Sequence, residues 1–250
     1  MLSHDEIEEV KAQAYIGKPS NLKSVCKVYP MKLFDIIEMG IGLYNKYLAQ
    51  LLLTEVDISK LIKEKTGETV PIEEIFPLEF LIQSAAHDDI FLLELQTAFS
   101  TFVKEDILIL PKINAILVGN PADRRLITKD NFVEFQTILR IQNRKEDNYT
   151  PPPENESEIA RKMRLKAEER DAIKRKQEQK DNGETSLTDL IEIAETYGIK
   201  CDEITLYAFY GRLHRHQARE KWEQDLQMLC AGADSTNIKT KYWGGSLEEK

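Results

Sequence analysis

The sequence predicts a mainly helical protein of the α+β class, and three observations support this prediction. Apolar residues recur at helical spacing over long stretches of the chain. Short β-rich runs bounded by Pro and Gly are confined to about residues 106–128. A stretch rich in proline and charge, residues 149–183, separates two more apolar parts. We therefore expect a helical N-terminal domain (1–148) with a short β-meander, a charged helical linker (149–183) and a small helical C-terminal domain (184–250).

The first helices of the N-terminal part follow from spacing and from end signals. Apolar residues at helical spacing predict one long helix over residues 32–53, with Pro30 just ahead of it. Asp57 is the expected cap of a shorter helix that Gly67 ends. Residues 78–103 repeat the apolar pattern with an interruption at 87–89, which predicts either one broken helix or two packed helices.

After residue 106 the sequence changes from apolar residues at helical spacing to short β-rich runs. Three β-rich runs, 107–110, 114–118 and 125–127, are separated by turn-forming Pro and Gly residues and predict a small meander. Thr128 or Asp130 can then cap a helix that continues to about Asn143.

The linker combines prolines with a basic run. Residues 151–153 are prolines, which block both helix and sheet pairing, and residues 158–180 carry nine basic against five acidic side chains. Apolar residues are too sparse there for a wide buried stripe, so we expect an exposed helical connector. The alternative is a nucleic-acid contact, which would depend steeply on salt because phosphate contacts release counterions. The net charge of −9 disfavours it for the chain as a whole.

Two helices are expected in the C-terminal part. Ser186 with Asp189 resembles a capping arrangement for a short amphipathic helix that stops at Gly198. Asp202 is the expected cap of a longer helix that ends before Gly232. Large aromatic side chains either pack within the protein or anchor a partner, and the candidate partner-binding residues of this part are Tyr207, Phe209, Trp222, Tyr242 and Trp243.

Tyr242 and Trp243 follow the stop at Gly232 and precede a Gly-Gly pair. Two interpretations are open for them. They form either a clasp folded back on Leu213, Trp222 and Leu226, or an exposed anchor for a partner.

No catalytic, cofactor-binding or metal-binding residues are predicted. His214 and His216 are two residues apart, so on a helix they point about 200° away from each other and cannot share one ion. The sequence contains no phosphate-binding glycine loop and no GxSxG nucleophile elbow. Cys26, Cys201 and Cys230 form no CxxC pair and lack a nearby His at a catalytic spacing. We expect a protein that is not an enzyme.

Composition bears on where the protein works. No apolar run reaches the roughly 18 residues of a membrane-spanning helix. The first residues, MLSHDEIEEV, are acidic and lack the apolar core of a signal peptide. The scattered cysteines suit a reducing compartment. These observations predict a soluble cytoplasmic protein without a membrane contact.

Two stretches carry a resemblance to a known group. They are residues 229–243, LCAGADSTNIKTKYW, and residues 125–140, RLITKDNFVEFQTILR, together with Val28-Tyr29-Pro30 ahead of a predicted helix. The chain resembles the tail assembly chaperones and baseplate hub assembly chaperones of long-tailed bacteriophages. The resemblance implies a non-enzymatic protein of the host cytoplasm. Its partners would be tail proteins (tape measure, hub or tail tube), it could self-associate, and it would promote virion morphogenesis. A structural virion component of the baseplate or neck is the alternative.

Overall fold

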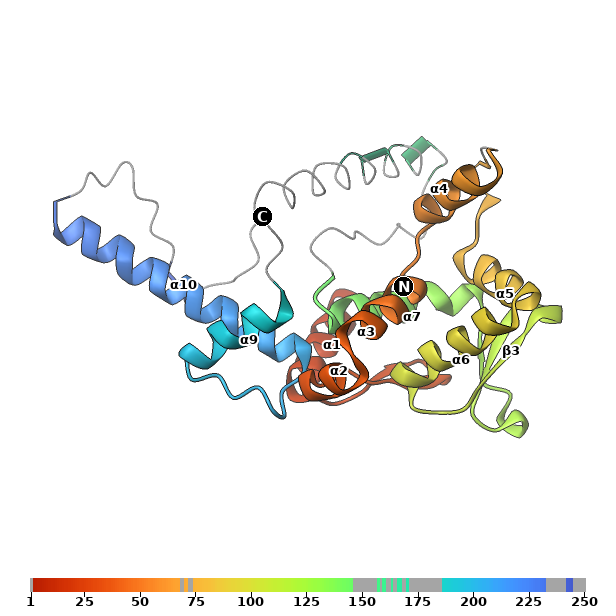
Figure 1. Ribbon diagram of the computed structural model, residues 1–250, viewed down its shortest axis with the longest axis horizontal. Coiled ribbons are helices and arrows are strands. Elements are labelled where there is room, and N and C mark those ends of the chain that lie inside the picture. The colour runs from red at the N-terminus through yellow and green to blue at the C-terminus, as the bar shows by residue number, and fades with distance from the viewer. Residues whose placement is uncertain are drawn as a thin grey trace.

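The computed structural model describes residues 2–67, 70–71, 74–145, 157, 159–160, 163, 166–167, 170, 186–232 and 242–244. These residues are mainly helical and include two small antiparallel sheets, which confirms the predicted class. The helices surround one hydrophobic cluster, and α10 extends away from this body (Figure 1).

The chain begins with a helix and a hairpin that the sequence analysis did not predict. Helix α1 (His4–Ile16) starts at a capping box in which Ser3 accepts from the Glu6 amide and Glu6 accepts from the Ser3 amide. Strands β1 (Ser20–Leu22) and β2 (Cys26–Val28) pair antiparallel after it. Only Val10 and Ala14 of α1 are buried, so this helix lacks the broad apolar stripe that periodicity detects.

The long helix predicted over residues 32–53 is wrong in one respect, because it is broken in two. Helix α2 (Leu33–Met39) ends at Gly40, and α3 (Ile41–Leu51) starts there. Gly40 has a φ of +95°, which residues with a side chain rarely adopt. Apolar spacing alone does not register this break, because both helices keep buried residues on the side that faces the core.

The following helices confirm most of the expected end signals. Helix α4 (Glu55–Thr66) ends at Gly67, as predicted, but its cap is Thr54. Asp57 is instead the third helical residue, and its carboxylate accepts from the Thr54 amide at 3.1 Å. Helices α5 (Pro77–His87) and α6 (Asp89–Val103) are two packed helices, the second of the two predicted alternatives.

The predicted meander is confirmed. Strands β3 (Ile107–Leu110), β4 (Ala115–Val118) and β5 (Leu126–Ile127) pair antiparallel in that order. The short 3₁₀ turns η2 (Pro111–Ile113) and η3 (Pro121–Asp123) connect them. All four residues of β4 are buried, as expected for the central strand.

Helix α7 (Lys129–Gln142) is a buried helix at the centre of the body, and its cap is Thr128, the first of the two predicted candidates. Its apolar side stacks Phe135 on Phe99 of α6, with ring centroids 5.2 Å apart. Its polar side is also buried. The Gln136 amide donates to the carbonyls of Leu51 and Leu53 at 2.9 and 3.0 Å, which satisfies acceptors at the C-terminal end of α3.

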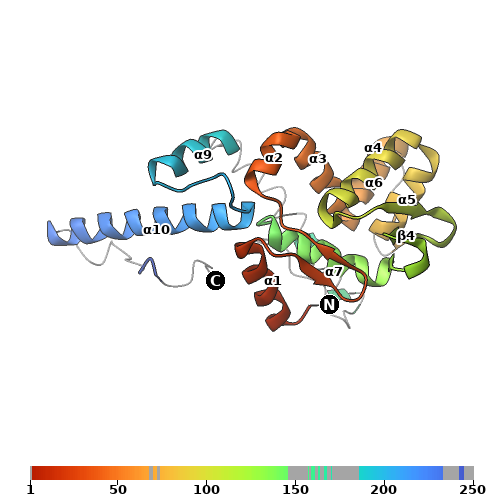
Figure 2. The same cartoon turned by 90° about the horizontal axis from the view of Figure 1, so that it is seen from below.

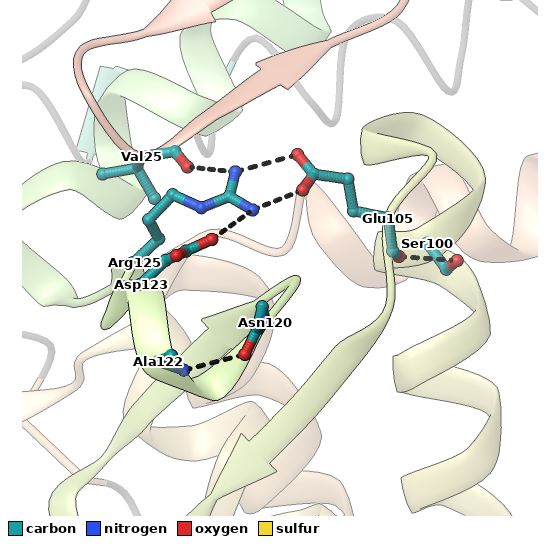
Figure 3. A network of polar contacts seen from close by, with 7 residues as sticks. All are labelled: Val25, Ser100, Glu105, Asn120, Ala122, Asp123 and Arg125. Carbon is teal, nitrogen blue, oxygen red and sulfur yellow. Dashed lines mark hydrogen bonds and ion pairs between the residues drawn. The ribbon is translucent and has the colours of Figure 1, made fainter.

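An ionic contact fixes the meander to the N-terminal hairpin (Figure 3). The Arg125 guanidinium donates to both Glu105 oxygens, at 3.1 and 2.6 Å, and to the Val25 carbonyl at 3.2 Å. Both side chains are less than one third exposed, so this bidentate pair is more than a solvated surface contact. Gly119 lies against the pair, since a Cβ at this position would lie 2.2 Å from Arg125 Nη2.

The C-terminal part contains α9 (Leu187–Thr196) and α10 (Leu206–Cys230). Ser186 and Asp189 form the predicted capping box. The predicted cap of the longer helix is wrong, because Thr205 and not Asp202 accepts from the Ala208 amide at 3.1 Å. Asp202 lies in the exposed connection before it. Sequence spacing does not distinguish two capping residues three positions apart.

The two parts of the chain share one hydrophobic cluster. Leu206, Tyr207, Phe209 and Leu213 of α10 belong to the same buried set as the core of the N-terminal part. The Leu33 amide donates to the Ile204 carbonyl at 2.9 Å, and the Leu206 amide donates to Met31 at 3.0 Å.

Most of the predicted linker, 149–183, lies outside the described residues. Those that are described at 159–160, 163, 166–167 and 170 are helical and exposed. The division into 1–148 and 184–250 stays a prediction about independent folding, and the contacts above show that the two parts pack on each other.

Candidate protein-binding surface

The distal half of α10 leaves the body of the protein. The buried residues of this helix lie in its first part, and the last of them is Leu213. Tyr197, at the end of α9, still contacts His216 and Glu220, and Figures 1 and 2 show from two directions that the far end of α10 extends beyond the other helices. Because tertiary packing supplies most helical stability, a projecting helix of this length gains stability from anything that packs on it.

Two of the five predicted partner-binding residues lie inside the protein. Phe209 is fully buried, and Tyr207 is buried under the guanidinium of Arg144, whose Cζ lies 3.6 Å from the ring centroid. Gly211 allows this approach, since a Cβ there would lie 3.1 Å from Arg144 Nη2. In this conformation the two rings attach α10 to the body and do not reach a partner.

The other three predicted residues come together. The ring centroids of Trp222 and Tyr242 are 5.9 Å apart in an edge-to-face contact, and Tyr242 and Trp243 are 5.9 Å apart. Two arginines complete the group. Arg215 donates from Nη1 to the Trp243 carbonyl at 2.8 Å, and the Arg219 guanidinium lies 5.9 Å from the Trp243 ring centroid. We refer to these five residues as the aromatic–arginine cluster.

The cluster combines the two interpretations left open for Tyr242 and Trp243. These residues fold back on Trp222, as a clasp would, but their other contacts are to Arg215 and Arg219. Tyr242 is nevertheless 62% exposed, and Trp222 and Trp243 are half-buried. The three rings therefore remain partly accessible at the surface.

The cluster continues along one face of α10. Arg215, Arg219, Trp222, Leu226 and Leu229 recur at alternating steps of four and three residues, which is the spacing of one helix face. We name these five residues the α10 stripe. Leu226 is 37% exposed and Leu229 is half-buried. The stripe therefore runs from a basic end to an apolar end.

The sequence analysis missed the two arginines. Arg219 lies three residues before Trp222 and Arg215 four residues before Arg219, and this spacing is the signal that could have found them. The attention to aromatic residues alone left out the cations that accompany Trp and Tyr at many protein interfaces.

The two histidines of α10 face different tyrosines. His216 stacks on Tyr197 of α9 with centroids 5.1 Å apart, and His214 lies 6.3 Å from the ring of Tyr210. The Tyr197 hydroxyl donates to Glu220 at 2.5 Å, which raises the pKa of Tyr197. Among the residues that the structure describes, no group of three or more His, Cys, Asp or Glu side chains could hold a metal ion.

Burial also favours the protonated thiol form of two cysteines. Desolvation raises the pKa of the Cys26 thiol to about 12, and it raises the pKa of Cys201 as well. Because the thiolate is the nucleophile, both side chains are held in the less reactive form near neutral pH. Cys230, near the end of α10, is exposed.

Comparisons with other proteins add no relative. No protein-family model, no curated protein and no solved structure matches the chain. In the described part of the chain, none of the helices has the length and apolar character needed to cross a membrane.

Proposed function

We propose that this protein is a non-enzymatic assembly chaperone of bacteriophage tail morphogenesis, acting in the host cytoplasm. It would hold a helix-rich tail protein, the tape-measure or hub protein, until tail tube or baseplate assembly proceeds. The observation that carries the proposal is the α10 stripe, which places aromatic, basic and apolar side chains on a helix that projects from the body (Figure 2).

The composition of the stripe supports a binding role. Trp, Tyr and Arg are the residue types that contribute most binding energy at protein interfaces. The residues of the α10 stripe lie on one continuous helix, so their relative positions are already ordered before a partner arrives. A preordered surface loses less conformational entropy on binding than a flexible one.

The sequence resemblance to tail and hub assembly chaperones supplies the identity of the partner class. It rests on residues 125–140 and 229–243, together with Val28-Tyr29-Pro30. The second stretch includes Leu229 of the stripe and both tail aromatics. The resemblance and the candidate surface therefore fall on the same part of the chain.

A structural component of the baseplate or neck is the second candidate, and exposed apolar side chains on the body favour it. Ile90 and Leu93 of α6 are 72% and 64% exposed and lie three residues apart on one helix face. A permanent virion interface would cover such a pair. Mass spectrometry of purified particles separates the two functions, because a chaperone is absent from the mature particle and a component is present at fixed stoichiometry.

Co-expression tests the chaperone function directly. The chain is produced together with the tape-measure or hub protein of the same phage, and the amount of soluble tail protein is measured. We expect the parent chain to keep the tail protein soluble and Trp222→Ala to lose most of this effect. Phe76→Ala is the matched control, since Phe76 is also a partly exposed aromatic but lies on the body beside Lys129. Equal solubility with and without the chain would refute the proposal.

A further inference from the structure

We propose, resting on the chaperone function above, that the α10 stripe binds an amphipathic helix of defined polarity. The bound helix is acidic where it faces Arg215 and Arg219, and apolar where it faces Leu226 and Leu229. The turn formed by Tyr242 and Trp243 occupies the basic half of the stripe and is displaced when this helix binds.

The spacing of the stripe specifies a helix as the occupant. Its residues alternate in steps of four and three, which is the repeat that lets two helices pack along a common seam. Trp222 lies at the middle, with arginines on one side and leucines on the other.

The basic side chains at one end of the stripe determine the direction in which the partner helix binds. Residues 212–221 contain four basic side chains and one acidic one, in a chain whose net charge is −9. The single acid, Glu220, accepts from the Tyr197 hydroxyl. Arg219 pairs with Glu223 at 2.7 Å, but both side chains are about half exposed, and such a pair contributes little stability. Opposite charge on the partner therefore steers it to this end of the stripe.

The tail turn already shows the type of contact that a partner would make. The Trp243 carbonyl accepts from Arg215 at 2.8 Å, and a carboxylate in the same place would accept a stronger, charge-assisted bond. The turn is compact, since a Cβ on Gly244 would lie 2.5 Å from the Tyr242 ring. The turn covers the basic half of the stripe, and Leu226 stays accessible beyond it.

Two synthetic peptides serve as probes. The acidic probe is a designed amphipathic helix of about three heptads, with leucines along its seam and glutamates at the seam positions of one end. The basic probe has lysines in place of those glutamates. Binding of each labelled peptide to the full chain is measured by fluorescence anisotropy. We expect the acidic probe to bind the parent at least about tenfold more tightly than the basic probe.

Charge reversal tests the polarity. The Arg215→Glu and Arg219→Glu double variant should bind the acidic probe about tenfold or more weakly than the parent does, and it should bind the basic probe more tightly. The control is Lys112→Glu with Lys200→Glu, which changes net charge equally but alters exposed lysines outside residues 212–221 and off the stripe. This control should keep the preference for the acidic probe. Equal loss in both double variants would reduce the effect to net charge and overturn the proposal.

The displacement step has its own test. The Tyr242→Ala and Trp243→Ala double variant should bind the acidic probe more tightly than the parent, because the competing turn is removed. Weaker binding would mean that the aromatics contact the partner directly, and it would overturn the displacement. These outcomes are independent of the natural partner. If the probes show the predicted polarity while co-expression gives no soluble tail protein, the helix-binding surface holds and the chaperone function fails.

Discussion

The guanidinium of Arg144 stacks on the ring of Tyr207, with Cζ 3.6 Å from the ring centroid. Arg144 follows the end of α7 and has a φ of +51°, in the left-handed region, while Tyr207 lies in the first turn of α10. The contact therefore joins the last described turn of the N-terminal part to the helix that carries the candidate surface.

Removing either member of this pair should destabilise the protein, and the two losses should not add. Tyr207→Ala should lower the free energy of unfolding by about 3 kcal/mol, as for other buried aromatic rings. Arg144→Ala should cost about 1 kcal/mol from the lost cation–π contact. Urea titrations of both single variants and the double variant give the coupling energy. A coupling indistinguishable from zero would mean that the stacking contributes nothing beyond burial of the ring.

The Gln136 side chain should contribute more to the free energy of unfolding than a glutamine on the surface does. Its amide donates to two carbonyls at the end of α3, and the side chain is buried. Gln136→Ala leaves these acceptors without their donor, so the free energy of unfolding should fall by about 1 to 3 kcal/mol. Gln83→Ala is the matched control, because Gln83 donates to Asn114 on the surface. The same urea titration should show little change for it, and an equal loss in both variants would contradict the argument.

The three thiols should react in a fixed order. Burial raises the pKa of Cys26 to about 12, so its thiolate is scarce until the pH approaches that value, whereas Cys230 is exposed. At pH 8 a thiol reagent should label Cys230 first, then Cys201, and label Cys26 on the timescale of unfolding. Raising the pH should speed labelling of Cys201, whose thiol pKa is also raised by burial, while labelling of Cys26 should continue to follow unfolding. Cys230→Ser should remove the fast phase, and a fast phase that survives this substitution would refute the assignment.

A cut in the linker should leave the two halves associated. The stretch 151–180 has three consecutive prolines and few apolar residues, so a specific protease site inserted after Asn155 should be cleaved readily. The pieces should co-elute in gel filtration under native conditions, because α10 shares the hydrophobic cluster of the N-terminal part. They should separate in urea. Separation without denaturant would show that the two parts are held together by the chain alone.

The turn at Trp243 should contribute little to stability. Its ring is half-buried and contacts Arg219 of α10 and the neighbouring Tyr242, away from the main cluster. Trp243→Ala should therefore lower the free energy of unfolding by less than about 1 kcal/mol, unlike replacement of a core aromatic. Differential scanning calorimetry measures this directly. A loss of several kcal/mol would place the ring in the core of the fold.

The fold could be predicted where a local signal is sufficient. The capping box at Ser186 and the turns around the meander depend on residues close in sequence, and each is confirmed. Other ends depend on tertiary contacts. Thr205 is chosen over Asp202 because its hydroxyl also donates to the Ala14 carbonyl at 2.7 Å, a bond across 191 positions of sequence. No local pattern reports such a partner.

The candidate surface could be predicted only in part, because contacts with distant segments of the chain leave no local signal. The sequence does not distinguish Tyr207 from Trp222, because both are aromatic residues of the same predicted helix. Their difference comes from Arg144 and the body, which cover the first ring and not the second. Aromatic residues could therefore be identified from the sequence as candidates for partner binding. Only the structure shows which of them lie beyond Leu213, the last buried residue of α10.

The single hydroxyl of Thr205 also determines how a pull on the distal helix reaches the rest of the molecule. It caps α10 through Ala208 and holds the last turn of α1 through Ala14, and the neighbouring backbone pairs with Met31. The projecting half of α10 thus acts as a lever whose pivot lies between the last turn of α1 and the segment that precedes α2. Tension applied at Trp222 would first strain the bonds at Ala14 and Met31. The earliest mechanical failure of the protein is therefore expected at that pivot, with the meander and α7 still intact.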